Sequence, residues 1–144
     1  NSKVAQTLAA GPVVVFCSRA ANSQDQIMLD KCGIEVVKLD RNADGLDLSA
    51  ALQWCAKREL SSLLLEAGTK LNHSFYSAGL IDQIIHLSAQ KNLKTGVPGL
   101  LYDANTRTAL AFPRDSDYTK ARTFELAGDR LSIWQRGKGM IGKL

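Results

Sequence analysis

Residues 63–82 read LLLEAGTKLNHSFYSAGLID and contain a change of pattern that bears on the whole fold. Three consecutive leucines are followed by one acid, Glu66, and then by a short turn that contains Gly68. A short apolar run bounded by a turn is typical of a buried strand, and the amphipathic stretch that begins at Thr69 is typical of a helix. The stretch therefore predicts a strand, a glycine turn and a helix, with a carboxylate at the carboxyl end of the strand.

The same alternation of short β-branched runs and amphipathic segments extends on both sides of this stretch. The expected strands are Pro12–Ser18, Ile34–Leu39, Ser61–Leu65 and Ile81–Ser88, and the expected helices are Asn22–Gly33, Asp47–Glu59 and Thr69–Gly79. A turn is expected at Arg41–Gly45. Because strands alternate with helices, the pattern favours right-handed crossovers and a mostly parallel sheet flanked by helices.

The pattern changes after residue 90, where glycine, lysine and turn residues become frequent. Antiparallel strands are expected over Thr108–Pro113, Ala121–Leu126 and Arg130–Arg136, and Gly128-Asp129 is expected to be the turn between the last two. The fold class predicted from the residues is therefore α/β, as one domain over residues 1–144. Its sheet is mostly parallel, flanked by helices, and has an antiparallel C-terminal end.

Composition limits the classes of partner. The chain has 144 residues, a net charge of +4 and no apolar run near the roughly 20 residues of a membrane-spanning helix, so no membrane partner is expected. It has no five-residue basic cluster, so no nucleic-acid partner is expected. Its three cysteines cannot all pair and show neither CxxC nor zinc-ligand spacing. They are interpreted as reduced core cysteines of a cytoplasmic protein, with no metal site.

Glu66 and Gly68 are the residues that most directly suggest a binding site. In an open parallel sheet, ligands bind outside the carboxyl ends of the strands, and a following helix points its free N–H groups at them. This predicts a phosphate site on the backbone of residues 68–74, with Glu66 directed at a hydroxyl or amine group of a second molecule. The alternative is that Glu66 caps the helix or pairs with a lysine, while Gly68 only turns the chain. The P-loop motif GxxxxGK[ST] is absent from the chain, and residues 63–82 contain no dinucleotide motif GxGxxG.

The central stretch also resembles the signature of the RibD C-terminal domain family, the reductases of riboflavin biosynthesis. The matching residues are Glu66, Ala67, Gly68, Leu71, Ser74, Ala78, Gly79, Leu80, Ile81 and Asp82. The segments before and after this stretch are similar to the same family. The resemblance implies a dihydrofolate-reductase-like fold.

The resemblance also implies an activity. Members of the family use NADPH to reduce the ribosyl group of 5-amino-6-(5-phosphoribosylamino)uracil, a phosphorylated pyrimidine, to a ribityl group. Glu66 would contact this substrate. The implied cofactor-binding residues are Gly68, Thr69, Lys70, Leu71, Asn72, His73 and Ser74, with Ser2 as a further contact. The resemblance further implies a homodimer and allows a fused deaminase domain upstream.

Some residues depart from the family pattern. Gln83 stands where the family usually has glutamate, and Gln90 stands where proline is common. The family's opening strand and the substrate-binding segments that follow it have no counterpart here, so the chain is expected to be the C-terminal part of a reductase domain that is inactive alone. Two alternatives stay open: a reductase of the same fold that acts on another pteridine- or folate-like substrate, and a non-catalytic α/β module for dimerisation or regulation.

Overall fold

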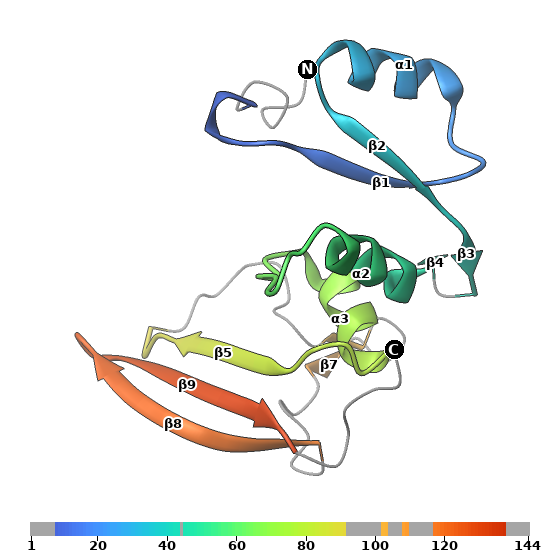
Figure 1. The fold of residues 1–144 in the computed structure, drawn as a ribbon. Coiled ribbons are helices and arrows are strands. Elements are labelled where there is room, and N and C mark those ends of the chain that lie inside the picture. The colour runs from blue at the N-terminus through green and yellow to red at the C-terminus, as the bar shows by residue number, and fades with distance from the viewer. Residues whose placement is uncertain (1–7, 44, 92–101, 104–107, 110–116, 138–144) are drawn as a thin grey trace. The chain divides into compact units, whose positions relative to one another are not determined.

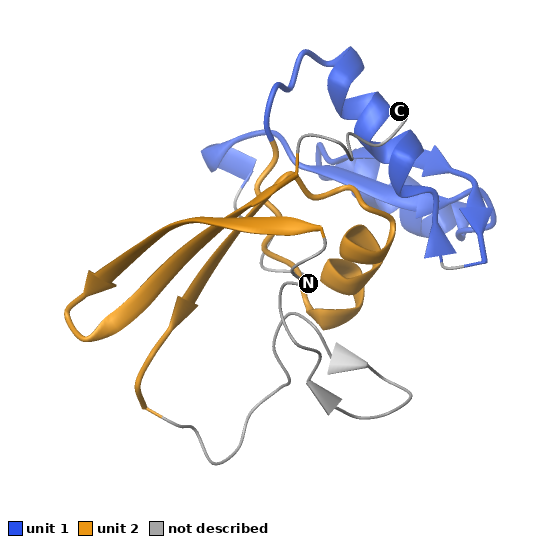
Figure 2. Cartoon of the chain, turned by 90° about the horizontal axis from the view of Figure 1, so that it is seen from below, with its two compact units in different colours: residues 1–62 blue, residues 63–144 orange. Residues whose placement is uncertain are grey.

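The computed structural model describes residues 8–43, 45–91, 102–103, 108–109 and 117–137. The chain divides into two compact units, residues 1–62 and residues 63–144, which Figure 2 colours separately. The single domain expected from the sequence stays a prediction. No helix in the described ranges has the length and apolar character needed to cross a membrane.

The first unit is built around a parallel pair of strands joined by a helix (Figure 1). Its elements in chain order are a short 3-10 helix η2 at Leu8–Ala10, β1 at Val14–Ser18, α1 at Ser23–Lys31, β2 at Glu35–Leu39, β3 at Arg41–Asn42, β4 at Gly45–Leu46 and α2 at Leu48–Lys57. Strands β1 and β2 pair in register from Val14–Glu35 to Ser18–Leu39. The expected strand, helix and strand are therefore confirmed, and the expected turn after them is closed by the antiparallel pair β3–β4.

Side-chain caps explain where both helices of this unit begin. The Asn22 side chain accepts a hydrogen bond from the N–H of Gln24, and the Asp47 side chain accepts one from the N–H of Ala50, each at 2.9 Å. Asparagine and aspartate are strong N-cap residues because they satisfy N–H groups that have no carbonyl partner in the first turn. Gly33, with a φ of 76°, follows the end of α1 in a conformation that suits glycine.

The core of the first unit is small and includes Ile34, Leu39 and Cys55, which are 3%, 7% and 8% exposed. Phe16 and Trp54 make an edge-to-face ring contact at 5.3 Å, and the Arg58 guanidinium lies 4.6 Å from the centre of the Trp54 ring. The three cysteines are free, but Cys32 is exposed. The prediction that all three are core residues is thus wrong for Cys32, because this residue is the C-cap of α1 at the surface.

The second unit contains one helix and an antiparallel sheet. Its elements are α3 at Thr69–Ser77, β5 at Gln83–Ser88, β6 at Tyr102–Asp103, β7 at Thr108–Ala109, β8 at Tyr118–Leu126 and β9 at Asp129–Arg136. Strands β5, β9 and β8 form a sheet in that order, and β6 pairs with β7. The rest of the strand expected over Thr108–Pro113 lies outside the described residues.

Two sequence predictions in this unit are wrong. Residues 61–65 form no strand, and Leu63 and Leu64 are 54% and 79% exposed, because the segment has no pairing partner among the described residues. Strand β5 pairs antiparallel to β9, so the parallel arrangement is confined to β1 and β2 in the described part of the chain. An apolar pattern identifies a strand but does not specify the direction of its neighbour.

The β8–β9 hairpin has a two-residue loop at Ala127 and Gly128, which lies one residue earlier than the expected Gly128-Asp129 turn. Both loop residues have positive φ, 51° and 93°, and Leu126 pairs with Asp129 across the loop. Hairpin turns with positive φ at both central residues match the twist of the flanking strands. The hairpin carries Tyr118 at the start of β8 and Arg136 at the end of β9, and both contact the segment that follows α3.

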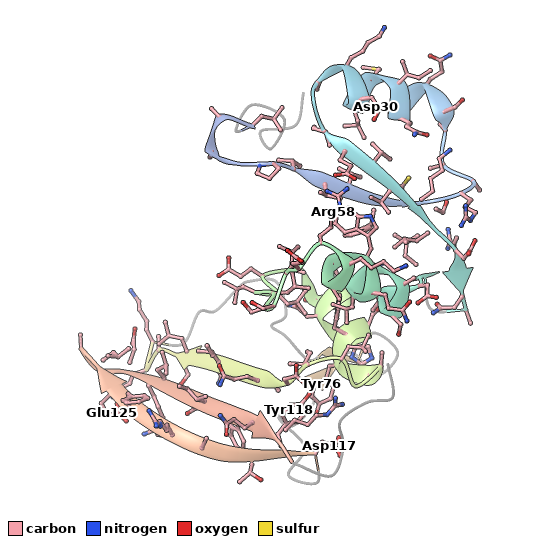
Figure 3. All side chains as sticks on the ribbon, viewed as in Figure 1. Asp30, Arg58, Tyr76, Asp117, Tyr118 and Glu125 are labelled. Atoms are coloured by element: carbon pink, nitrogen blue, oxygen red, sulfur yellow. The ribbon has the colours of Figure 1, made fainter. Side chains whose placement is uncertain are left out.

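The C-terminal end of α3 is fixed by contacts from this hairpin. Gly79 N–H donates to Tyr76 O and Leu80 N–H donates to Phe75 O, each at 3.0 Å, which is the Schellman pattern of helix termination. The Tyr118 hydroxyl donates to Ile81 O at 2.8 Å, and its ring stacks on Tyr76 at 5.7 Å, as the two labelled side chains in Figure 3 show.

Tyr118→Phe is expected to lower the free energy of unfolding by roughly 1 kcal/mol at neutral pH, since the bond to Ile81 O is lost while the ring stacking stays. Burial raises the pKa of Tyr118, and the positive charge of Arg136 partly offsets this rise. Stability from the neutral phenol is therefore complete below the unfolded pKa of about 10 and declines as pH rises from there through the higher folded pKa. Urea unfolding should show a weaker alkaline decline in the variant; the same decline in both proteins would contradict the assignment.

Candidate functional site

The candidate site lies at the N-terminal end of α3. Gly68 is the N-cap, with φ −71° and ψ 166°, and no side chain caps the helix from this position. The N–H of Asn72 is bonded to Gly68 O at 3.1 Å, which is the first helical hydrogen bond. The N–H groups of Lys70 and Leu71 precede it and have no carbonyl partner within the helix, and the helix dipole makes this end electropositive. The end of the helix can therefore accept an anionic group.

Glu66 lies two residues before this helix end and is exposed. Its carboxylate makes no hydrogen bond or ion pair with any residue that the structure describes. The alternative interpretation, in which Glu66 caps the helix or pairs with a lysine, is not supported for those residues. The carboxylate is available to accept hydrogen bonds from a ligand.

Gly68 leaves open space beside the helix end. A Cβ built on Gly68 would have no heavy atom of the described residues within 4 Å apart from its chain neighbours. The φ of Gly68 is also one that other residues adopt readily. The absence of a side chain here is therefore not required by the backbone or by packing, which is consistent with room kept for a ligand close to the backbone.

The remaining predicted residues of α3 differ in how far they reach solvent. Lys70 and Leu71 are exposed, whereas Thr69, His73 and Ser74 are half-buried. The Ser74 hydroxyl donates to Lys70 O at 3.0 Å, and His73 Nε2 lies 3.2 Å from the Ser77 hydroxyl. The structure thus places Glu66, Gly68, Lys70 and Leu71 at an accessible helix end. Ser2 lies outside the described residues.

Asn72 differs from the other predicted contacts of α3 because it is buried. It is only 3% exposed, and its side-chain Nδ2 donates to Ala67 O at 2.6 Å. Its Oδ1 is buried and has no hydrogen-bond partner among the described residues. The Asn72 side chain therefore lies in the interior, where it is bonded to the turn that carries Glu66 and Gly68.

Sequence reasoning missed Arg136 and Tyr118, which hold the other end of α3. Arg136 Nη1 donates to Gly79 O across a separation of 57 residues, and Tyr118 reaches Ile81 O across 37 residues. No local motif signals such distant partners. The available signal was the Ala78-Gly79-Leu80-Ile81-Asp82 stretch, because a glycine directly after a helix predicts a constrained C-terminus.

Solved structures with a similar fold include a pyrimidine reductase-like protein from Corynebacterium diphtheriae, with 16% identity and a TM-score of 0.68, of which the match covers 50%. Two crystal forms of RibD from Acinetobacter baumannii match with 18% and 16% identity and TM-scores of 0.62 and 0.57, over 31% and 37% of those chains. Each match covers 87% of the present chain. The chain thus spans half or less of the length of these proteins, and identities this low establish likeness of fold alone.

None of the curated proteins matches the sequence significantly. The family model of the RibD C-terminal domain matches residues 2–93. This range is more than half of the chain and includes Glu66, Gly68 and all of α3. The chain belongs to the RibD C-terminal domain family.

Proposed function

We propose that the chain is part of a riboflavin-pathway reductase that uses NADPH to reduce the ribosyl group of 5-amino-6-(5-phosphoribosylamino)uracil to a ribityl group. The observation that carries the proposal is the arrangement at the start of α3, where the exposed carboxylate of Glu66 precedes a helix end without a side-chain cap. Membership of the RibD C-terminal domain family supports the reaction class. The proposal also includes three expectations from the sequence: a homodimer, a fused deaminase domain and a cytoplasmic location.

The residues present fit the phosphate groups of NADPH. Gly68 leaves space for close approach, the first turn of α3 offers backbone donors, and the exposed amine of Lys70 is placed on that turn. Backbone donors at a helix end bind phosphate because the N–H groups and the dipole act together. When bound, the cofactor supplies the hydride; the protein supplies orientation and electrostatics.

Glu66 suits the substrate rather than the phosphate groups of the cofactor. A carboxylate accepts hydrogen bonds and repels phosphate, so its natural partners are hydroxyl or amine groups. Hydrogen bonds to an ionised carboxylate are among the stronger ones in proteins. We therefore assign the sugar hydroxyls of the substrate to Glu66, which would hold the ribosyl group next to the cofactor.

NADPH binding measured by calorimetry tests the cofactor site, both on this chain and on the full-length protein that contains it. Binding by the full-length protein is expected, and Lys70→Gln should weaken it about three- to tenfold, because one exposed charge contact to phosphate is lost. Lys31→Gln removes an exposed lysine at the end of α1 and should leave the affinity unchanged. Gly68→Ala should weaken NADPH binding more than Lys70→Gln, since its Cβ would fill the open space, while the protein stays folded.

The possible results separate the proposed function from its alternatives. If neither protein binds NADPH, the anion site is wrong and the non-catalytic module becomes the better account. If NADPH binds but the full-length protein does not oxidise it with the phosphorylated pyrimidine, a reductase with another substrate is indicated. Oxidation of NADPH that depends on this pyrimidine supports the proposal in full.

A further inference from the structure

Asn72 connects the interior of α3 to the turn that carries the candidate site. Its backbone N–H donates to Gly68 O at 3.1 Å, and its side-chain Nδ2 donates to Ala67 O at 2.6 Å. One residue therefore holds two successive carbonyl groups of the turn. Only 3% of the residue is exposed, so the side chain makes this contact from inside the protein.

Asparagine is an unfavourable choice for this position if stability alone matters. It is a weaker helix former than alanine or leucine, and a buried amide loses its contacts with water. Its Oδ1 is also left without a hydrogen-bond partner among the described residues. The hydrogen bond to Ala67 O is the contact that distinguishes asparagine from an apolar side chain at this position.

Because the peptide bond is planar, the bond between Asn72 and Ala67 O also sets the direction of the Gly68 N–H at the candidate site. The Ala67 carbonyl and the Gly68 N–H belong to one peptide unit. Peptide bonds are almost always trans, and in a trans unit the C=O and N–H vectors point in opposite directions. Because Asn72 holds the carbonyl toward the protein interior, the Gly68 N–H must point the other way. This N–H makes no hydrogen bond with any described residue, and the space beside Gly68 is open.

We propose that Asn72 is a positioning residue that turns the Gly68 N–H outward as a donor for a phosphate group, rather than a residue that contacts the cofactor. This inference rests on the proposed function, since it assigns a role within the NADPH site. The N-cap N–H is one of the donors that a helix start leaves without a partner, but the N-cap residue is not helical, so the helix does not fix the direction of this N–H. The clamped peptide unit fixes that direction and the backbone directly after Glu66.

The test compares NADPH binding and thermal stability of the full-length protein with those of Asn72→Leu and Asn72→Ala. Leucine has a similar volume and removes the side-chain donor, and alanine serves if the leucine variant does not fold. Either variant is expected to weaken NADPH binding at least tenfold. The melting temperature of Asn72→Leu should stay close to that of the unmodified protein, whereas Asn72→Ala should melt at a lower temperature because it leaves a cavity at a buried position. Asn22→Ala, which removes an asparagine-to-backbone bond at the start of α1, should lower the melting temperature without changing the affinity.

A spectroscopic readout separates positioning from general stability. In ¹H–¹⁵N spectra, the Gly68 amide of the unmodified protein should be among the resonances that NADPH shifts most, and this shift should be small in Asn72→Leu at the same occupancy. Unchanged affinity and an unchanged Gly68 shift in a folded Asn72 variant would overturn this inference and leave the NADPH site standing. Absence of NADPH binding by the unmodified protein would overturn the proposed function and this inference together.

Discussion

Gly79→Ala is expected to lower the free energy of unfolding by roughly 2 kcal/mol, because alanine is strained in this backbone conformation and the Arg136 guanidinium has to shift. Gly79 has a φ of 67°, in the left-handed region that costs other residues about 1 kcal/mol or more. A Cβ at this position would lie 2.5 Å from Arg136 Nη2. The Arg136 guanidinium lies at the free end of a flexible side chain, so it can move aside at a modest cost, and its bond to Gly79 O would be weakened.

The measurement is urea or thermal unfolding of the two proteins, and a decrease in melting temperature of about 6 °C corresponds to this loss for a chain of this size. Gly128→Ala is the matched control, because Gly128 also has a positive φ, 93°, but a Cβ added there would have no heavy atom within 4 Å apart from its chain neighbours. It should show the conformational cost alone. Equal losses in the two variants would show that the Arg136 contact contributes nothing.

A double-mutant cycle tests whether the loss of stability comes from the contact between residue 79 and Arg136. In an Arg136→Ala background, Gly79→Ala should cost only the conformational part, so the two changes should be non-additive. Additive losses would contradict a direct contact between the two residues. Because Arg136 N–H also donates to Asp82 O at 2.9 Å, the backbone at the end of β9 stays attached to the turn in this background.

The local part of the fold could be predicted from the sequence because its signals are local. Asn22 and Asp47 cap the helices that they were expected to begin, and the β-branched run before Ser18 forms β1. The helix that follows Gly68 begins at Thr69, as the amphipathic pattern indicates. Caps, turns and periodicity act within a few residues, so one sequence is sufficient to locate them.

The direction of pairing could not be predicted, because it depends on contacts between residues far apart in the chain. The apolar pattern of Ile84 and Ile85 is compatible with either direction, and only the pairing of β5 with β9 resolves it. The burial of Leu63 and Leu64 was also predicted wrongly: their apolar run was interpreted as a buried strand, but both residues are exposed. Burial requires a partner surface that the run itself does not specify.

The candidate site stays a prediction, and the structure adds how far each of its residues is exposed. Glu66, Gly68 and Lys70 are accessible as the motif implied, whereas Asn72 is buried against Ala67 O. A sequence shows that a polar residue lies in the motif, but it does not show which side of the helix end the residue faces. Arg136 and Tyr118 bond to carbonyls at the opposite end of α3, so contacts within the unit hold the helix at both ends.

Glu66→Gln is expected to lower kcat of the full-length protein about 100-fold while the protein stays folded. The substitution keeps the shape of the side chain and removes its charge, so the loss measures the hydrogen bonds that only a carboxylate makes strongly. A decrease of this size equals about 2.7 kcal/mol of transition-state stabilisation, which is typical when one positioned electrostatic group is removed. The measurement is NADPH oxidation at saturating pyrimidine substrate.

The same substitution should not weaken NADPH binding, although it lowers kcat, and this difference makes the prediction specific. Removal of a negative charge two residues from Gly68 relieves repulsion of phosphate, so NADPH should bind Glu66→Gln equally well or slightly more tightly. Glu125→Gln is the control: this exposed carboxylate pairs with Arg130 at 3.1 Å on the β8–β9 hairpin, and its loss should leave kcat unchanged. An unchanged kcat in Glu66→Gln would exclude Glu66 from the reaction. Weaker NADPH binding together with a normal kcat would instead assign Glu66 to the cofactor, because a group that contacts only the cofactor changes its affinity and leaves the positioning of the substrate intact.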